Sequence, residues 1–358
     1  MPVVDLAELG VGGGSIAWAD AAGGLRVGPN SVGATPGPAC FGTGGDLATV
    51  TDAAVVTGII AGRNVLGSER PLDLERARTA LGDVGAKLGL DPVGAAVAAR
   101  EVASAEIAAA VRRLLFYRGV DPADLTLIAF GGTGPLHAAE VAEMVGIAEV
   151  LVPRSAGVFT TFGLLSSELG IERSVHLGVV LGPDCDQAIR AALADLEAEA
   201  RAVLLGGQEE TPQLRVERSA DMRFRHQVQT LALGLPPNDL GHEELAQLFR
   251  EEFARQFGLS SEGEVELVQL QVRVIAQQCV AATDDQANPL GLRRLGDKEI
   301  FLEPAAPLRA DHLELVPGGV LGAVPGPAVI DLPHTSVLVV PGWTARPTDG
   351  GDLALKRD

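Results

Sequence analysis

The stretch LTLIAFGGTGPLHAA, residues 125–139, constrains the fold more than any other feature of the sequence. It opens with a short run of apolar strand formers, which a glycine cluster ends, and Pro135 then suits the first turn of a helix. The stretch therefore predicts a strand, a tight glycine turn and a helix. Such a turn leaves backbone N–H groups free at a helix start and lets a flat or anionic ligand approach the main chain, as nucleotide sites require. An ordinary strand-to-helix loop of an α/β domain is the alternative.

A second glycine loop lies near the N-terminus, where residues 10–14 read GVGGG. Short alternating apolar stretches then predict a β-hairpin over residues 15–27. Residues 28–45 contain too much glycine and proline for regular structure, and a long ordered loop of this kind is usually functional. It leads into a helix that we expect Thr51 or Asp52 to cap, with a contact to nucleotide-bound Mg²⁺ as the alternative role of Asp52.

Helical spacing covers residues 72–88 and 92–119, and the second of these segments carries an apolar stripe typical of a core helix. Strand, helix, strand and helix then follow one another up to residue 168, which predicts parallel strands with right-handed crossovers. Ligands on such sheets bind beyond the carboxyl ends of the strands. The glycine turn and the loop at residues 153–157 are therefore expected to face one crevice.

The pattern changes near residue 183, beyond which strands dominate and antiparallel pairing is expected. Two amphipathic helices interrupt these strands, over residues 187–204 and 243–257. We therefore expect an α/β domain over residues 1–182, followed by a smaller α+β domain over residues 183–358.

Composition narrows the classes of partner. The net charge of −19 argues against nucleic acid and anionic membranes, since both need clustered lysine and arginine. No apolar run is long enough to span a membrane, and the first residues lack the basic flank and apolar core of a secretory signal, so we expect a cytoplasmic protein. Cys40, Cys185 and Cys279 are few and far apart, which predicts reduced thiols, mostly buried.

The polar cluster at residues 223–227, RFRHQ, invites a catalytic assignment. On a strand, Arg223, Arg225 and Gln227 share one face, while Phe224 and His226 share the other. An exposed basic face of a sheet is the simpler interpretation. The sequence contains no Ser-His-Asp signature, HExxH motif or Walker lysine loop, so no catalytic residue is assigned.

Six stretches carry a family resemblance: GVGGGSIAWAD (10–20), VGPNSVGATPGPACFGTGG (27–45), TVTDA (49–53), LIAFGGTGPLHAAEVAEMVGI (127–147), VLVPRSAGVFTTFGLL (150–165) and PGPAVIDLPHTSVLVVPGW (325–343). Together they resemble the C-terminal portion of the A-type subunit of the ATP-dependent hydantoinase/oxoprolinase family, which is also found in acetone and acetophenone carboxylases. The resemblance implies an actin-like ATPase lobe of the ribonuclease H-like type, incomplete at its N-terminus. In it, AFGGTGP at residues 129–135 corresponds to the adenosine-binding turn.

The resemblance also implies chemistry. Its cofactors are ATP and Mg²⁺ or Mn²⁺, and its substrate is a small cyclic amide such as 5-oxoproline or a hydantoin, or a ketone in the carboxylases. Phosphorylation of the amide oxygen by ATP turns the lactam carbonyl into an activated imidate that water can attack. Catalysis of phosphoryl transfer is mainly positioning and charge neutralisation.

The site residues follow from matching these motifs. The residues assigned to the adenosine-binding turn are Gly131, Gly132, Thr133 and Gly134. A loop near the substrate or the phosphates is expected from Gly12, Gly13, Gly14 and Ser15. The candidate metal contacts are Asp52 and Asp20. His137, one turn into the helix, is expected to be structural or a neighbour of the ribose.

The sequence departs from the family in one respect. Members of this type begin with an N-terminal half carrying two phosphate-binding turns, written roughly DxGGT, and neither is found here. We therefore expect this chain to hold the nucleoside side of a cleft and to need an N-terminal ATPase half supplied in trans, with a B-type hydantoinase subunit as a further partner. A truncated fragment and a catalytically silent assembly subunit are the alternatives. Alone, the chain is expected to be inactive and to associate through apolar surface that the other lobe normally covers.

Overall fold

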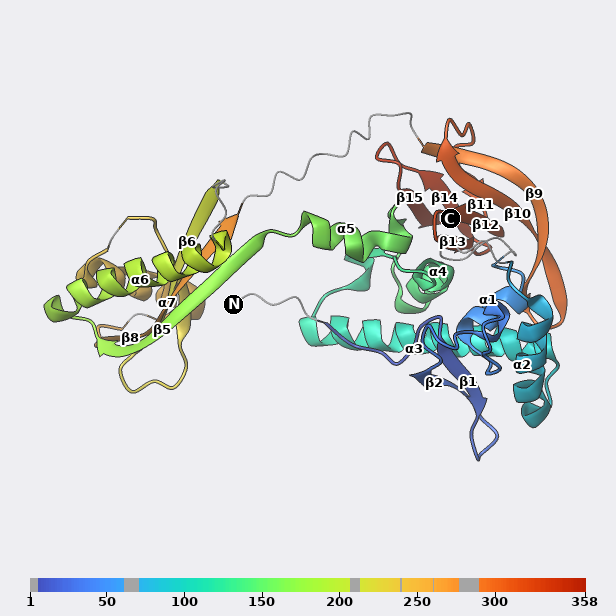
Figure 1. The fold of residues 1–358 in the computed structure, drawn as a ribbon, viewed down its shortest axis with the longest axis horizontal. Coiled ribbons are helices and arrows are strands. Elements are labelled where there is room, and N and C mark those ends of the chain that lie inside the picture. The colour runs from blue at the N-terminus through green and yellow to red at the C-terminus, as the bar shows by residue number, and fades with distance from the viewer. Residues whose placement is uncertain (1–5, 61–70, 207–212, 239, 260, 277–289) are drawn as a thin grey trace. The chain divides into compact units, whose positions relative to one another are not determined.

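The computed structural model describes most of the chain, namely residues 6–60, 71–206, 213–238, 240–259, 261–276 and 290–358. The chain forms two compact units (Figure 1): a smaller one, Leu165–Ala281, and a larger one made of Val4–Leu164 and Ala282–Asp358. This division differs from the boundary expected at residue 182. The reason is strand β15 (Leu353–Arg357), which pairs with β4 (Glu149–Val152) and so returns the end of the chain to the sheet of the larger unit.

The larger unit begins with the predicted hairpin and continues with helices. Strands β1 (Ser15–Ala19) and β2 (Leu25–Ser31) pair antiparallel. The 3-10 helix η1 (Ala39–Phe41) precedes the helices, which are α1 (Val50–Val56), α2 (Leu74–Leu88) and α3 (Pro92–Arg118). Helices α2 and α3 confirm the predicted segments. Each begins at an aspartate that caps it through its side chain and ends at a glycine in the left-handed conformation.

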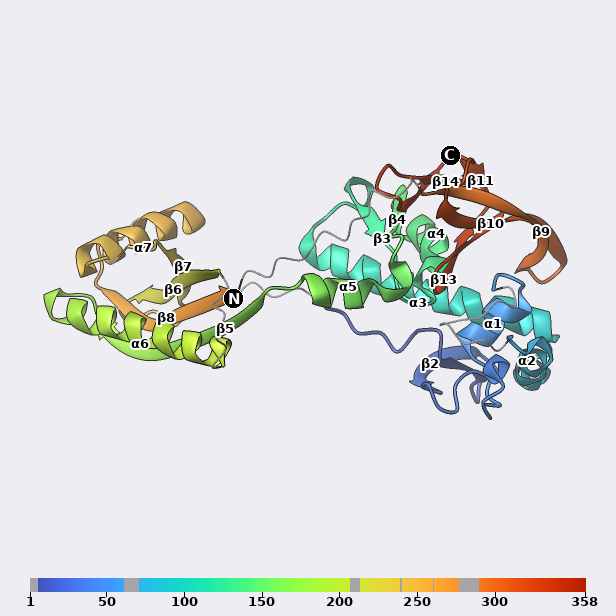
Figure 2. The same cartoon turned by 45° about the horizontal axis from the view of Figure 1, so that its top comes forward.

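The strand, glycine turn and helix predicted at residues 125–139 are confirmed as β3 (Thr126–Ile128) and α4 (Gly134–Val145). Strand β3 pairs with β4 in parallel, with Leu127 opposite Val150. A five-stranded sheet in the order β11-β14-β15-β4-β3 results, in which β11 is Val324–Pro325 and β14 is Trp343–Pro347. The lobe is thus mixed α/β, with a parallel pair at one edge of an otherwise antiparallel sheet (Figure 2).

A second sheet of the larger unit has the order β13-β12-β10-β9. Its strands are β9 (Leu290–Glu303), β10 (Ala306–Pro317), β12 (Ala328–Leu332) and β13 (Thr335–Val339). Only β10 and β12 pair in parallel. Both sheets and the helices of this unit share one hydrophobic core, in which the large side chain of Trp343 is almost fully buried. The remaining short elements are η3 (Pro122–Asp124), η4 (Ala156–Val158) and α5 (Phe159–Ser166).

The smaller unit is a four-stranded antiparallel sheet with helices on one face. The strand order is β5-β8-β6-β7, with β5 at Leu169–Val180, β6 at Leu214–Phe224, β7 at Leu231–Leu235 and β8 at Val265–Ala276. After η5 (Pro183–Cys185) come α6 (Asp186–Leu205) and, later, α7 (His242–Phe257). Both helices bury their apolar stripes against alternate residues of β6 and β8, which makes one core.

The basic cluster at residues 223–227 lies at the end of β6, where it is neutralised locally. Arg223 pairs with Glu266 of β8 at 2.8 Å. Arg225 pairs at 2.7 Å with Glu264, which directly precedes β8. Phe224 points to the other face and is buried against α7. The expected alternation along a strand holds only for Arg223 and Phe224, because β6 ends there and the chain turns at Arg225 and His226, with φ of 73° at His226 and a bond from the Gln227 N–H to the Phe224 carbonyl. Both arginines are paired with carboxylates, so the cluster is not a free basic patch.

Two further expectations concern the cysteines and membrane-spanning segments. Cys40 is buried, Cys185 is partly buried, and both are free thiols; Cys279 lies outside the described residues. Burial, aided by the negative charge of Asp52, raises the pKa of the Cys40 thiol far above its ordinary value. Within the described ranges, no helix has the length and apolar character needed to cross a membrane.

Asp52 joins helix α1 to the long glycine-rich loop. Its carboxylate accepts hydrogen bonds from the N–H and the hydroxyl of Thr49 (2.9 and 2.7 Å), and from the N–H groups of Ala39 and Cys40 (3.3 and 2.7 Å). The Thr49 hydroxyl accepts from the Asp52 N–H in return, which completes a capping box. The helix cap is thus Thr49, not Thr51 or Asp52, because the carboxylate reaches back from the third helical position.

Helices α3 and α4 are joined by a buried polar network beneath the glycine turn. Arg100 is 2% exposed and donates to Glu140 at 2.7 Å. The Ser104 hydroxyl donates to the other oxygen of Glu140 and lies 2.8 Å from Nδ1 of His137. Since that hydroxyl proton is used, His137 carries its own proton on Nδ1 and donates it to Ser104. His137 is therefore a structural residue that fixes the start of α4.

We expect Asp52→Asn to lower the free energy of unfolding of the larger unit by about 2–4 kcal/mol, because an amide group would face N–H donors that now share a carboxylate. Both tryptophans of the chain, Trp18 and Trp343, lie in this unit, so urea unfolding followed by tryptophan fluorescence reports on it. The loss should be the same with and without Mg²⁺. Asp46→Asn, an exposed carboxylate on the same loop, is the control. A loss seen only with Mg²⁺ would instead assign Asp52 to a metal.

A second prediction concerns pH. Burial, reinforced by the charge of Arg100, lowers the pKa of His137 to about 4. Between this value and the ordinary pKa of about 6.5, the unfolded chain binds a proton that the folded chain does not. The free energy of unfolding should therefore fall by roughly 2–4 kcal/mol as pH drops through this window, and level off below it. His137→Gln should flatten that part of the pH profile; an unchanged profile would show that His137 does not contribute.

Candidate functional site

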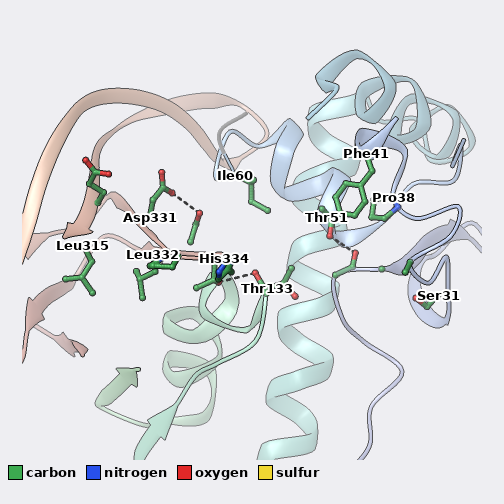
Figure 3. A pocket seen from close by; sticks show the side chains of 18 of the residues that line it. Ser31, Pro38, Phe41, Thr51, Ile60, Thr133, Leu315, Asp331, Leu332 and His334 are labelled. Carbon is green, nitrogen blue, oxygen red and sulfur yellow. Dashed lines mark hydrogen bonds between the residues drawn. The ribbon is translucent and has the colours of Figure 1, made fainter. Parts of the chain in front are cut away.

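A cleft of about 900 Å³ lies in the larger unit, and both predicted glycine loops line it (Figure 3). The N-terminal loop contributes Gly13 and Gly14, and the glycine turn contributes Gly132 and Thr133. The facing wall is formed by β10 and by the β12–β13 hairpin, and Figure 3 shows Thr133 between this wall and the N-terminal segments. Its volume lies within the range of small-molecule and cofactor sites.

The N-terminal loop is held in place by two hydroxyl side chains. The N–H and the hydroxyl of Thr51 both donate to the carbonyl of Gly13, each at 2.9 Å. The Ser15 hydroxyl accepts from the Gly12 N–H and donates to the Gly10 carbonyl, and it is 4% exposed. Ser15 is thus committed to closing the loop, which leaves its hydroxyl turned away from the cleft.

Gly13 is the point at which the two glycine loops meet. A Cβ on Gly13 would lie 2.8 Å from the side-chain methyl of Thr133 and 2.8 Å from the hydroxyl of Thr51. Both distances are shorter than carbon atoms of real side chains tolerate, so the approach requires glycine. The structure therefore brings together two segments that the sequence separates by more than a hundred residues.

The glycine turn itself presents backbone to the cleft. Gly131 has φ of 89°, and its N–H donates to the carbonyl of Ala156 at 2.7 Å, which ties the turn to the loop after β4. A Cβ on Gly132 or Gly134 would meet no atom within 4 Å. Thr133 stands at the start of α4 without making a side-chain cap. The start of this helix is thus open on the side of Gly132 and Thr133.

The facing wall was not anticipated as a site. It includes Asp331, whose carboxylate lies 2.8 Å from Nε2 of His312 and accepts from the Ser336 hydroxyl at 2.8 Å. The hydroxyl of Thr335 donates to the Gly132 carbonyl at 3.1 Å, which links the β12–β13 hairpin to the glycine turn. These residues lie in the PGPAVIDLPHTSVLVVPGW stretch, which resembles the family but carries no motif that indicates chemistry.

The charge of the lining is unusual for a nucleotide site. No lysine or arginine is among the described residues that line the cleft, whereas two carboxylates, Glu314 and Asp331, are. Glu314 is paired with Arg293, outside the lining. Lys298 lies behind the wall, where its ammonium donates to the Ile59 carbonyl at 2.9 Å and burial lowers its pKa to about 8. The lining therefore suits a neutral, hydroxyl-bearing ligand group better than a triphosphate.

The two candidate metal contacts lie away from the cleft lining. Asp20 accepts from the N–H groups of Ala22 and Gly24 and from Arg26, and these donors hold the pKa of its carboxyl below its ordinary value. Asp52 is fully buried, and its carboxylate accepts the four hydrogen bonds described above. In the described parts of the chain, no group of three or more His, Cys, Asp or Glu side chains is arranged to hold a metal ion. This geometry favours turn-forming and capping roles for both.

Of the residues assigned from the motifs, four line the cleft: Gly13, Gly14, Gly132 and Thr133. The other four, Gly12, Ser15, Gly131 and Gly134, belong to the same two loops but are not among the described lining residues. His137 is not among the described residues that line the cleft, and its burial lowers its pKa and favours the neutral imidazole.

Comparison with known proteins extends these observations. Residues 1–173 match the family model for hydantoinase/oxoprolinase. The chain is 31% identical to the caprolactamase α subunit of Pseudomonas jessenii, over 96% of this chain and 51% of that subunit. It is 30% identical to the acetophenone carboxylase γ subunit of Aromatoleum aromaticum, over 93% of this chain and 48% of that subunit.

Solved structures agree with the fold. The structure of an ATP-dependent caprolactamase from Pseudomonas jessenii superposes with a TM-score of 0.69 at 29% identity, over 97% of this chain and 52% of that one. A nucleotide-free acetone carboxylase gives a TM-score of 0.86 at 20% identity, again over 97% and 52%. The chain thus spans about half the length of the relatives that it matches. The match to the hydantoinase/oxoprolinase model thus covers residues 1–173, and similarity to the caprolactamase and acetophenone carboxylase subunits extends across the rest of the chain.

Proposed function

We propose that this chain is the nucleoside-side part of an ATP-dependent enzyme that opens a cyclic amide. The observation that carries the proposal is that the two glycine loops meet at Gly13 and Thr133 in the wall of one cleft. The described lining of this cleft contains no lysine or arginine. Glycine backbone gives a flat base close approach, and the start of α4 offers backbone dipoles of the sign that favours an anion. This lobe is the actin-like ATPase part that the family resemblance implies.

The reaction begins with attack of the lactam oxygen on the γ-phosphorus of ATP, which releases ADP. The product is a phosphorylated imidate, in which amide resonance no longer protects the ring carbon. Water adds to that carbon, the C–N bond breaks with protonation of nitrogen to leave an acyl phosphate, and a second water molecule hydrolyses the acyl phosphate to a carboxylate and phosphate. The ring is thereby converted into an open-chain amino acid. In this scheme the residues of the described cleft bind and orient the nucleoside and exclude water from it; none of them handles the transferred phosphoryl group.

The triphosphate needs positive charge that the described lining of this cleft does not supply, since phosphoryl transfer depends on neutralising the phosphate oxygens. The described residues do not fit a divalent ion. We therefore assign the phosphate contacts, together with ligands for Mg²⁺ or Mn²⁺, to an N-terminal ATPase half, and the water-attack step to a B-type partner subunit. The chain spans only half the length of its relatives, which is consistent with this division.

A ketone carboxylase is the second candidate function, because acetophenone carboxylase and acetone carboxylase are similar over nearly the whole chain. The two functions share carbonyl activation by ATP and differ in what attacks next. A catalytically silent assembly subunit of either complex is the remaining alternative, and it predicts that the cleft binds no nucleotide.

The nucleotide assignment is tested by Gly132→Val. Because a Cβ at Gly132 meets no protein atom within 4 Å, the variant should fold normally while its side chain enters the cleft. We expect calorimetric titration with ADP and Mg²⁺ to show at least tenfold weaker binding in the assembled protein, and no binding by the isolated chain. Gly322→Val is the matched control, since Gly322 is equally unobstructed and does not line the cleft. Equal affinity in both variants would show that the nucleotide binds elsewhere.

The reaction class is tested by supplying ATP with 5-oxoproline, a hydantoin or ε-caprolactam, in the presence and absence of bicarbonate. Ring opening predicts release of ADP, phosphate and a linear amino acid at a rate that does not depend on bicarbonate. A carboxylase predicts no turnover of lactams, and turnover of a ketone only when bicarbonate is present. Mass spectrometry of the product separates the two outcomes.

A further inference from the structure

Strand β3 is an open edge of the five-stranded sheet. It is the last strand in the order β11-β14-β15-β4-β3 and pairs with β4 alone. The N–H of Ala129 donates to the carbonyl of Leu151 on the β4 side. Because backbone polar groups alternate along a strand, the N–H and C=O of Ile128 point to the open side. They are available to a further strand.

The side chains around this edge are apolar and exposed. Ile128, the last residue of β3, is 50% exposed, and Phe130, two residues further on, is 42% exposed. Exposed apolar residues scattered singly need no explanation, but a contiguous group beside an unpaired strand is unusual in a monomer.

Helix α5 extends the same surface. Its first residue, Phe159, stacks against Phe130 with ring centroids 5.1 Å apart, which places the helix next to the end of β3. The helix reads FTTFGLLS and contains no buried residue. Phe162 is 47% exposed and Leu164 is 74% exposed. An eight-residue helix gains little stability by itself and normally depends on burying its apolar side chains.

The opposite edge of this sheet is built differently. Strand β11 has only two residues, and one of them is Pro325, which has no N–H to offer to a neighbour. Short length and proline are the usual devices that keep a sheet edge from pairing. Strand β3 is also short, with three residues, but it contains no proline, so each of its N–H groups can donate and the two edges of one sheet differ in this respect.

We propose that the β3 edge and the exposed face of α5 form the docking surface for the other half of the family fold, which adds a strand beside β3 and covers Phe130 and Phe162. This inference rests on the proposed function, because it identifies the occupant as the part of the related ATPase subunits that this sequence does not match. The relatives are about twice as long as this chain, so the occupant is of comparable size. A docked strand also lies next to the glycine turn, since β3 leads directly into Gly131.

A second copy of the chain is a poorer occupant on electrostatic grounds. Each copy carries a net charge of −19, and like charge of this size opposes close association of two copies. The described surface residues that define the edge are uncharged, so they offer no compensating ion pairs.

The test measures binding between the full chain and a probe, the half of the Pseudomonas jessenii caprolactamase α subunit that this chain does not match. We expect Ile128→Glu and Phe162→Glu each to weaken the complex at least tenfold, and hydrogen exchange at residues 126–130 to slow when the wild-type complex forms. Val320→Glu is the control, because Val320 is 92% exposed and precedes β11 at the opposite edge of the sheet. All three variants should keep the wild-type unfolding midpoint, since none of the three residues is buried.

Absence of a complex, wild-type affinity in both edge variants, or slowed exchange only at sites other than β3 would each overturn the docking assignment. So would a homodimer of the wild-type chain that protects residues 126–130 equally well. Binding is measured without nucleotide, so the result is separate from the proposed function. A complex that forms through β3 and yet binds no ADP would retain the docking surface and remove the nucleotide role.

Discussion

The cleft depends on one backbone carbonyl, that of Gly13, which Thr51 holds through both its N–H and its hydroxyl. This bond places the N-terminal loop across the start of α1, close enough to Thr133 that no side chain fits on Gly13. The same helix start is tied to the loop at Ala39 and Cys40 through Asp52. A single short helix therefore positions three segments that are distant in sequence, and a change at its N-terminus reaches the cleft without touching a ligand.

The charge of the cleft lining limits which part of a nucleotide the cleft can bind. A described lining with two carboxylates and no cation is a poor host for a triphosphate, even though the glycine loops and the start of α4 are typical of nucleotide sites. The two facts agree if the cleft holds a sugar and a base while the phosphates extend toward another polypeptide. Asp331 fits this view, because its partners His312 and Ser336 fix a carboxylate at the cleft wall, where it can accept hydrogen bonds from hydroxyl groups.

Local patterns predicted a large part of the fold. Helices α2 and α3, the hairpin predicted at residues 15–27, and the strand, turn and helix around Gly131 all follow from periodicity, caps and glycine placement. Strand β2 continues to Ser31, into the stretch expected to be irregular. The sequence did not indicate that β15 pairs with β4, because strand pairing across two hundred residues leaves no local pattern. For the same reason the Asp331 wall was missed, whereas both glycine loops were found. The cap of α1 was placed at Thr51 or Asp52 and lies at Thr49, because only the fold shows which way the Asp52 carboxylate turns.

The pairing of β15 with β4 also explains how the larger unit has a closed core and an open edge at once. Strands β14 and β15 bury Trp343, Leu353 and Leu355 in the core that helices α1 to α4 share, so strands of the chain itself complete that side of the described sheet. Completion on that side leaves β3 as the last strand on the other. The exposed apolar residues at β3 and α5 therefore lie outside the hydrophobic core of the larger unit. They surround the sheet edge at which we propose that a further strand pairs. In this lobe the glycine turn lies at the end of that same edge strand, so whatever pairs with β3 is brought to the mouth of the nucleoside cleft.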